Sequence, residues 1–191
     1  MLESELRLHE GKLEEAIARA REGVVLEETS ASAQEQLGEA LLLAGRLEEA
    51  LPHFIEALGR GSLSALAGGV VALKFLETGK LPEARQVFRL QRRGAALGCA
   101  LAHSATALIR LEENQPAESL ELAHLAWREY SDLPAWADQP PVRALLLEAL
   151  LRVLDSWLEQ APSGDPDLGA ARELRRQVAE GRPPRTDHSR D

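Results

Sequence analysis

The stretch GKLEEA at Gly11–Ala16 returns twice in nearly the same letters, as GRLEEA at Gly45–Ala50 and as GKLPEA at Gly79–Ala84. Each copy begins 34 residues after the one before it. A fixed interval of this length is typical of proteins built from stacked repeats, in which each repeat is one small supersecondary unit. The interval therefore decides how the rest of the chain is divided.

The residues around the second copy predict a helix, a turn and a second helix. Apolar and small side chains recur at the three- and four-residue spacing of an amphipathic helix on both sides of Gly45. They are Leu37, Ala40, Leu41, Leu47, Ala50, Leu51, Phe54, Ala57 and Leu58. Gly45 separates the two runs, because glycine readily takes the left-handed backbone that ends a helix. The unit is a helical hairpin with roughly 12 to 14 residues in each helix.

This hairpin resembles a tetratricopeptide repeat. The matching residues of the second copy are Leu37, Gly38, Leu41, Gly45, Ala50, Phe54 and Ala57. The third copy has Ala72, Phe75, Gly79, Ala84 and Phe88 at the same places. The first copy offers Gly11, Ala16 and Ala20, with a short first helix around Leu2 and Leu6. The resemblance implies an all-α fold, a right-handed α-solenoid of antiparallel helix pairs over about residues 1–134.

A fourth copy appears when Ala65–Ala84 is aligned with Ala100–Ser119 at an offset of 35. Asn114 replaces the turn glycine, which is tolerable because asparagine also accepts left-handed geometry. We place the extra residue between helices, within Arg92–Gly98, and take Pro134 as a displaced equivalent of the proline that usually ends a repeat of this family. The predicted repeats are residues 1–30, 31–64, 65–99 and 100–134.

The pattern changes after Pro134. We expect a break at the Pro140–Pro141 pair, a long helix to about Gln160, and a last helix that starts at Asp165 and Pro166, because a capping side chain precedes a proline at the first helical position. Residues 135–180 then form a divergent helix pair that caps the solenoid, since the final apolar face of a repeat array needs a polar cover. The composition of residues 181–191 predicts a disordered tail.

Composition limits the classes of partner. The 191 residues carry a formal net charge of −9, so the chain is a poor nucleic-acid binder and should be repelled by anionic membranes. Cys99 is the single cysteine, which excludes an internal disulfide. The charged N-terminus has no secretory signal pattern, and no stretch is apolar enough to cross a membrane. We expect a cytoplasmic protein.

The sequence contains no recognisable catalytic or metal-binding pattern. The five histidines are His9, His53, His103, His124 and His188, and no two of them have the spacing of helical metal ligands. Cys99 lies in an apolar run and is best explained as a small buried side chain. Gly68 and Gly69 lie inside a helix, where we expect them to allow close contact with a neighbouring helix. We therefore expect no cofactor and no enzymatic activity.

One candidate binding surface is the concave groove that the resemblance implies, lined by the first helix of each pair. The positions that would face it are Ser32, Glu35, Gln36, Glu39, Leu66, Gly69, Val70, Leu73, Leu101, Ser104, Ala105 and Leu108. The Lys, Asn and Arg set with which some members of the family hold a terminal carboxylate is absent. A groove that is acidic at one end and apolar in the middle suits an amphipathic helix or an extended peptide. Equally, the long helix Val142–Gln160 could cover these leucines itself.

A second candidate is a basic stripe formed by Arg85, Arg89 and Arg92, whose spacing puts them on one helix face. It suits an acidic partner, or it is a solvated face paired with neighbours such as Glu83. The sequence thus favours a non-catalytic scaffold that binds a protein or peptide. The alternatives are a self-associating subunit, such as a homodimer, and the C-terminal repeat part of a larger regulatory protein, in which Met1 is not the natural start.

Overall fold

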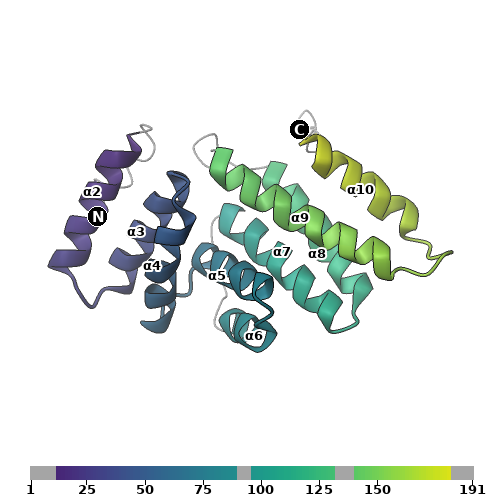
Figure 1. Cartoon of the computed structure of the whole chain (residues 1–191), viewed down its shortest axis with the longest axis horizontal. Helices are drawn as coiled ribbons and strands as arrows, with labels where there is room; N and C mark the ends of the chain where they lie inside the picture. The colour runs from purple at the N-terminus through teal and green to yellow at the C-terminus, as the bar shows by residue number, and fades with distance from the viewer. Residues whose placement is uncertain (1–11, 90–95, 132–139, 182–191) are drawn as a thin grey trace, which may run out of the picture.

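The computed structural model describes residues 12–89, 96–131 and 140–181, and these ranges are helical with no β-strand (Figure 1). The all-α prediction is confirmed. The helices are α2 (Leu13–Leu26), α3 (Ala31–Leu43), α4 (Leu47–Gly59), α5 (Ala65–Glu77), α6 (Leu81–Arg89), α7 (Ala96–Glu112), α8 (Pro116–Ser131), α9 (Pro140–Gln160) and α10 (Leu168–Glu180).

Most of these helices pack against their neighbours in chain order. α3 packs on α4, α5 on α6, α7 on α8, and α9 on α10, so these eight helices form four pairs. Each pair also contacts the next one, through α4 with α5, α6 with α7, and α8 with α9. Figure 1 shows the succession from α2 in purple to α10 in yellow. The paired helices therefore bury apolar side chains both within a pair and between adjoining pairs, and α2 packs on α3.

Three of the turns between paired helices have the same backbone geometry. Gly45, Gly79 and Asn114 take positive φ angles of 77°, 72° and 59°. At Gly79 the amide N–H of Lys80 donates to the Phe75 carbonyl and that of Gly79 donates to Leu76, which is the Schellman ending of a helix. The same two hydrogen bonds recur in the other two turns. The expected left-handed geometry of Asn114 is confirmed.

The starts of α3 and α5 repeat as regularly as the turns do. The hydroxyl oxygen of Ser30 accepts a hydrogen bond from the Ala33 amide at 3.2 Å, and that of Ser64 accepts one from Ala67 at 3.3 Å. Such caps satisfy amide groups that have no partner inside the helix. The two serines are 34 residues apart, so the repeat interval also fixes where these helices begin.

Helices α5 and α7 cross with their backbones in contact. A Cβ atom on Gly69 would lie 2.8 Å from the Ala102 amide nitrogen, so only glycine fits there without a shift. The expected close helix contact at Gly69 is confirmed. On the other helix, Gly98 plays the same part against Leu66. Gly98 lies inside α7, which begins at Ala96, so the prediction that the residues up to Gly98 lie between helices is wrong for Ala96–Gly98.

Helix α9 packs on α7 and reaches the C-terminal ends of α3 and α5. Pro141, in its first turn, is next to Gly45 after α3. Arg152 donates a hydrogen bond to the Leu76 carbonyl near the end of α5, at 3.2 Å. Proline is well suited to a first helical turn, because its missing N–H would have no partner there. The expected break at Pro140–Pro141 is thus the start of α9 itself.

The last helix begins later than we expected. The Asp165 carboxylate accepts a hydrogen bond from the Asp167 amide at 2.9 Å and so stabilises a turn, and α10 starts at Leu168. Other expectations concern residues outside the described ranges. They are the short first helix around Leu2 and Leu6, the first turn at Gly11, Arg92, Pro134 and the tail from residue 182 onward.

Candidate binding surface along helix α9

The polar residues of the expected groove lie on α3 and are partly accessible. Glu35, Gln36 and Glu39 are half-buried, and Ser32 is exposed. The Ser62 hydroxyl donates a hydrogen bond to the Glu35 carboxylate at 2.8 Å, which ties the connection between α4 and α5 to α3. These side chains lie in the N-terminal part of the molecule, where they could contact a partner.

The apolar residues of the expected groove are mostly enclosed. Leu66 on α5 is half-buried, and the others have exposed fractions of 5% or less. The enclosed residues are Val70, Leu73, Leu101, Ser104, Ala105 and Leu108. The crossing of α5 and α7 at Gly69 buries part of this set, since Leu101 and Ala102 lie directly against Gly69.

Helix α9 accounts for much of the remaining burial. Leu73 of α5 faces Leu145 and Ala149 of α9 across a hollow of about 40 Å³. Leu108 of α7 faces Arg152 and Ser156 of α9 across a larger cavity. The long helix therefore lies over the leucines that would otherwise line an open groove.

The larger cavity, about 130 Å³, lies where α9 passes the ends of α5 and α7. Its apolar wall consists of Leu76, Leu81, Leu108 and Leu111. Leu76, Leu108 and Leu111 are buried, while Leu81 at the start of α6 is half-buried. Three successive helices thus contribute aliphatic side chains to one small space, which we call the α9 cavity.

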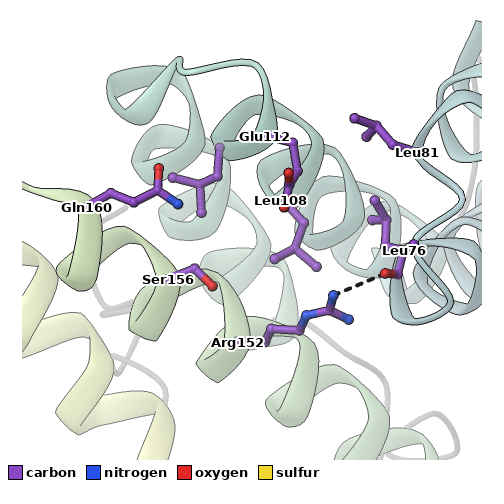
Figure 2. Close-up of a pocket in the computed structure, with 9 residues that line it drawn as sticks. Leu76, Leu81, Leu108, Glu112, Arg152, Ser156 and Gln160 are labelled. Carbon is purple, nitrogen blue, oxygen red and sulfur yellow. Dashed lines mark hydrogen bonds between the residues drawn. The ribbon is translucent and has the colours of Figure 1, made fainter.

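Polar side chains form the other wall of the α9 cavity. They are Glu112, Arg152, Ser156 and Gln160. Figure 2 shows Arg152, Ser156 and Gln160 on successive turns of α9, with the Arg152 guanidinium directed to the Leu76 carbonyl. Glu112, Arg152 and Gln160 are exposed, so the cavity meets solvent on this side. An aliphatic wall beside exposed polar groups is the usual construction of a ligand pocket.

The outer face of α9 adds a shallow hollow next to the cavity. Its apolar centre is formed by Leu147 and Leu151, both half-buried, together with Ala144. Glu148 and Glu159 stand in the same hollow. Arg152 borders both this hollow and the α9 cavity, so the two form one continuous surface.

Three carboxylates of this surface have no ion-pair partner within the described parts of the chain: Glu112, Glu148 and Glu159. Acidic residues elsewhere are commonly paired. Glu48 lies 2.8 Å from Lys74, and Asp155 of α9 pairs with Arg175 of α10. The surface around Arg152 is therefore acidic overall, in agreement with the negative charge of the whole chain.

The basic stripe is described only at Arg85. Its Nε atom lies 2.9 Å from the Glu113 carboxylate, in the turn between α7 and α8. Arg89 ends α6, and its side chain lies outside the description, as does all of Arg92. Arg85 is thus already engaged within the molecule.

The titratable side chains in the interior pair with protein groups. His53 Nδ1 lies 2.7 Å from Gln34 Oε1, and His103 Nδ1 lies 2.8 Å from a Glu129 oxygen. Burial raises the pKa of the Cys99 thiol, which favours its neutral form. Within residues 12–89, 96–131 and 140–181, no group of His, Cys, Asp and Glu side chains is arranged to hold a metal ion.

A separate apolar patch lies at the end of α2. Val25 and Leu26 are 73% and 83% exposed, next to Arg21 and Glu22. This patch belongs to the first described helix, at the other end of the molecule from α10 (Figure 1). Sequence reasoning did not single it out.

None of the described helices combines the length and the apolar content that crossing a membrane requires.

No protein-family model matches the sequence, and no curated protein matches it significantly. The sequence analysis did not identify the α9 residues that form the cavity and the hollow. Their signal was the row of polar residues on one face of an otherwise apolar helix, from Glu148 to Glu159.

Proposed function

We propose that this chain is a non-catalytic protein–protein interaction scaffold of the tetratricopeptide-like, right-handed α-solenoid type, and that its partner is a peptide segment or a helix of another protein. The observation that carries the proposal is the α9 cavity with the adjoining hollow. Partner side chains could reach both without any rearrangement of the fold.

The proposed binding surface differs from the concave groove that the sequence analysis favours. The apolar residues on α5 and α7 are buried, so a partner would contact α9 and the turn between α5 and α6. The half-buried polar residues Glu35, Gln36 and Glu39 would extend the contact toward α3. Interfaces of this kind combine a few deeply seated apolar side chains with a polar rim.

Display of random twelve-residue peptides on phage, with the immobilised full chain as bait, tests the proposal. We expect selected peptides to bind the chain in solution and to lose affinity in variants of α9. The matched variants are Leu151→Asp, which places a charge in the hollow, and Ala170→Asp on the exposed face of α10. Failure to select any peptide, or equal binding by both variants, would contradict the proposal.

A second candidate function is self-association, and the exposed pair Val25 and Leu26 favours it. Large apolar side chains that stand open at one end of a helical stack are natural dimer contacts. Sedimentation velocity of the full chain decides the question. A dimer that Leu26→Glu dissociates supports this function, and a monomer at all concentrations excludes it.

A further inference from the structure

We infer that the α9 cavity receives a single branched aliphatic side chain of the partner, and that lysine or arginine residues flank that side chain in the partner sequence. The inference rests on the proposed function and specifies the chemistry of the partner. It depends on the size of the cavity, the composition of its walls and the unpaired charges around it.

The size of the cavity matches one aliphatic side chain. Its volume of about 130 Å³ has room for about four water-sized groups. The side chain of leucine has four carbon atoms and that of isoleucine also has four. A tryptophan ring would need a larger space. A leucine or isoleucine side chain therefore fits the cavity, whereas a tryptophan side chain does not.

The walls of the cavity suit an apolar tip on a polar backbone. Leu76, Leu108 and Leu111 are buried and offer aliphatic contacts to the tip. Ser156 and Gln160 line the same space with groups that can donate and accept hydrogen bonds. A partner backbone carries one N–H and one C=O per residue, and these groups could replace the water that solvates Ser156 and Gln160.

Arg152 is not free to serve as an anion site. Its guanidinium donates to the Leu76 carbonyl, which also accepts the Gly79 amide of the helix ending. Arg152 therefore helps to hold α9 against the end of α5, while its charge is partly engaged with that carbonyl. Within the described ranges, the charges of this surface that have no ion-pair partner, on Glu112, Glu148 and Glu159, are negative.

Charge complementarity then defines the flanking residues. Glu112 lies on the α7 side of the cavity. Glu148 and Glu159 lie on α9, about three turns apart, with Arg152 and Ser156 between them. None of the three has an ion-pair partner within the described ranges. Basic residues on both sides of the aliphatic anchor would meet these carboxylates, and acidic flanks would be repelled.

The test uses three synthetic nine-residue peptides with blocked ends, and fluorescence polarisation measures their binding to the full chain. The first has a central leucine with two lysines on each side and alanine elsewhere. The second has serine in place of the leucine, and the third has glutamate in place of every lysine. We expect the first peptide to bind at least tenfold more tightly than either of the others.

Two pairs of variants locate the binding. Ser156→Leu fills the cavity and should weaken the leucine peptide at least tenfold, whereas Ala170→Leu adds the same group to the exposed face of α10 and should change nothing. Glu148→Lys should weaken the leucine peptide at least threefold more than Glu121→Lys, which makes the same charge change on the exposed face of α8. Thermal unfolding of each variant confirms that it folds.

Each result supports or overturns the inference. Equal binding of the leucine and serine peptides, equal effects of Ser156→Leu and Ala170→Leu, or no binding of the leucine peptide would overturn it. If phage-selected peptides bind the chain and Ser156→Leu does not change their affinity, the scaffold function is supported and the α9 cavity is not the anchor site. If no selected or synthetic peptide binds at all, both the scaffold function and the anchor site in the α9 cavity are contradicted.

Discussion

A Cβ atom on Gly98 of α7 would lie 2.6 Å from the amide nitrogen of Leu66 on α5, closer than any side chain can approach. Gly69 makes the reciprocal approach from α5. These two glycines set the distance between α5 and α7, and the ends of the same two helices form the wall of the α9 cavity. The cavity therefore depends on a helix crossing that tolerates no side chain.

Gly98→Ala should destabilise the protein. Overpacking of a close backbone contact costs about 1 to 3 kcal/mol, and the gain in helix propensity of about 1 kcal/mol offsets only part of it. Urea unfolding measures the difference. The matched control is Gly23→Ala in α2, where a Cβ atom meets nothing within 4 Å. Gly23→Ala should stabilise the chain, and stabilisation by both substitutions would refute the crossing.

The left-handed turns give a second prediction. Gly79→Ala should lower the stability by about 1 kcal/mol, because a side chain is strained at this φ angle while space is not limiting. Gly79→Asn should cost less, since Asn114 occupies the equivalent turn at φ 59°. Chemical denaturation of the two variants side by side measures this order. Equal costs for alanine and asparagine would show that the backbone angle does not limit the choice of residue.

Trp157 connects α9 to the first residue of α8. Its indole N–H donates to the Pro116 carbonyl at 2.8 Å. Trp157→Phe should destabilise the protein by about 1 to 3 kcal/mol, because it removes this hydrogen bond and leaves part of the space of a buried indole ring unfilled. Hydrogen exchange should accelerate along α9.

Trp127→Phe is the matched control, because it removes the same indole group elsewhere. The Trp127 indole donates at 3.3 Å to Gln177, which is a half-buried side chain that can turn to solvent. We expect a smaller loss of stability and no preferential acceleration of exchange in α9. The reverse order of the two variants would mean that α9 is held mainly by other contacts.

The burial of His53 leads us to expect that the protein loses stability in mild acid. Burial, with a smaller effect of Arg21, lowers the pKa of His53 below its usual 6.5, although Glu49 acts in the opposite direction. The unfolded chain therefore binds more protons between the two pKa values, so stability is greatest above pH 6.5 and falls as the pH drops below it.

Melting temperatures at pH 7.5 and pH 5.5 check this sign. We expect the decrease for the natural chain to exceed the decrease for His53→Gln, which keeps a polar group near Gln34 but does not titrate. If the melting temperature of His53→Gln decreases as much as that of the natural chain, His53 is not the cause of the loss of stability.

The sequence predicted the local features of this fold well, because these follow from short-range chemistry. Gly45, Gly79 and Asn114 marked helix endings, since few residues adopt a left-handed backbone. The glycines in the apolar run at Gly68–Gly69 indicated a close helix contact. Sequence reasoning could not identify Gly98 as the partner in that contact, because the two glycines belong to helices that are not consecutive.

The position of α9 explains why the candidate site moved. Periodicity showed that α9 has a broad apolar face, and covering the leucines of α5 and α7 was one of two open outcomes. The choice depends on contacts between residues as distant as Leu76 and Arg152, which no local pattern encodes. For the same reason the cavity that these contacts leave open could not be inferred from spacing.

Mapping of the lysine-flanked leucine peptide on the ¹⁵N-labelled chain by NMR tests the central claim most directly. We predict that the largest amide shifts fall at the turn between α5 and α6 and along α9 from Arg152 to Gln160. Shifts confined to α2 and α3, or spread evenly over acidic residues of the whole surface, would contradict a binding site at the α9 cavity.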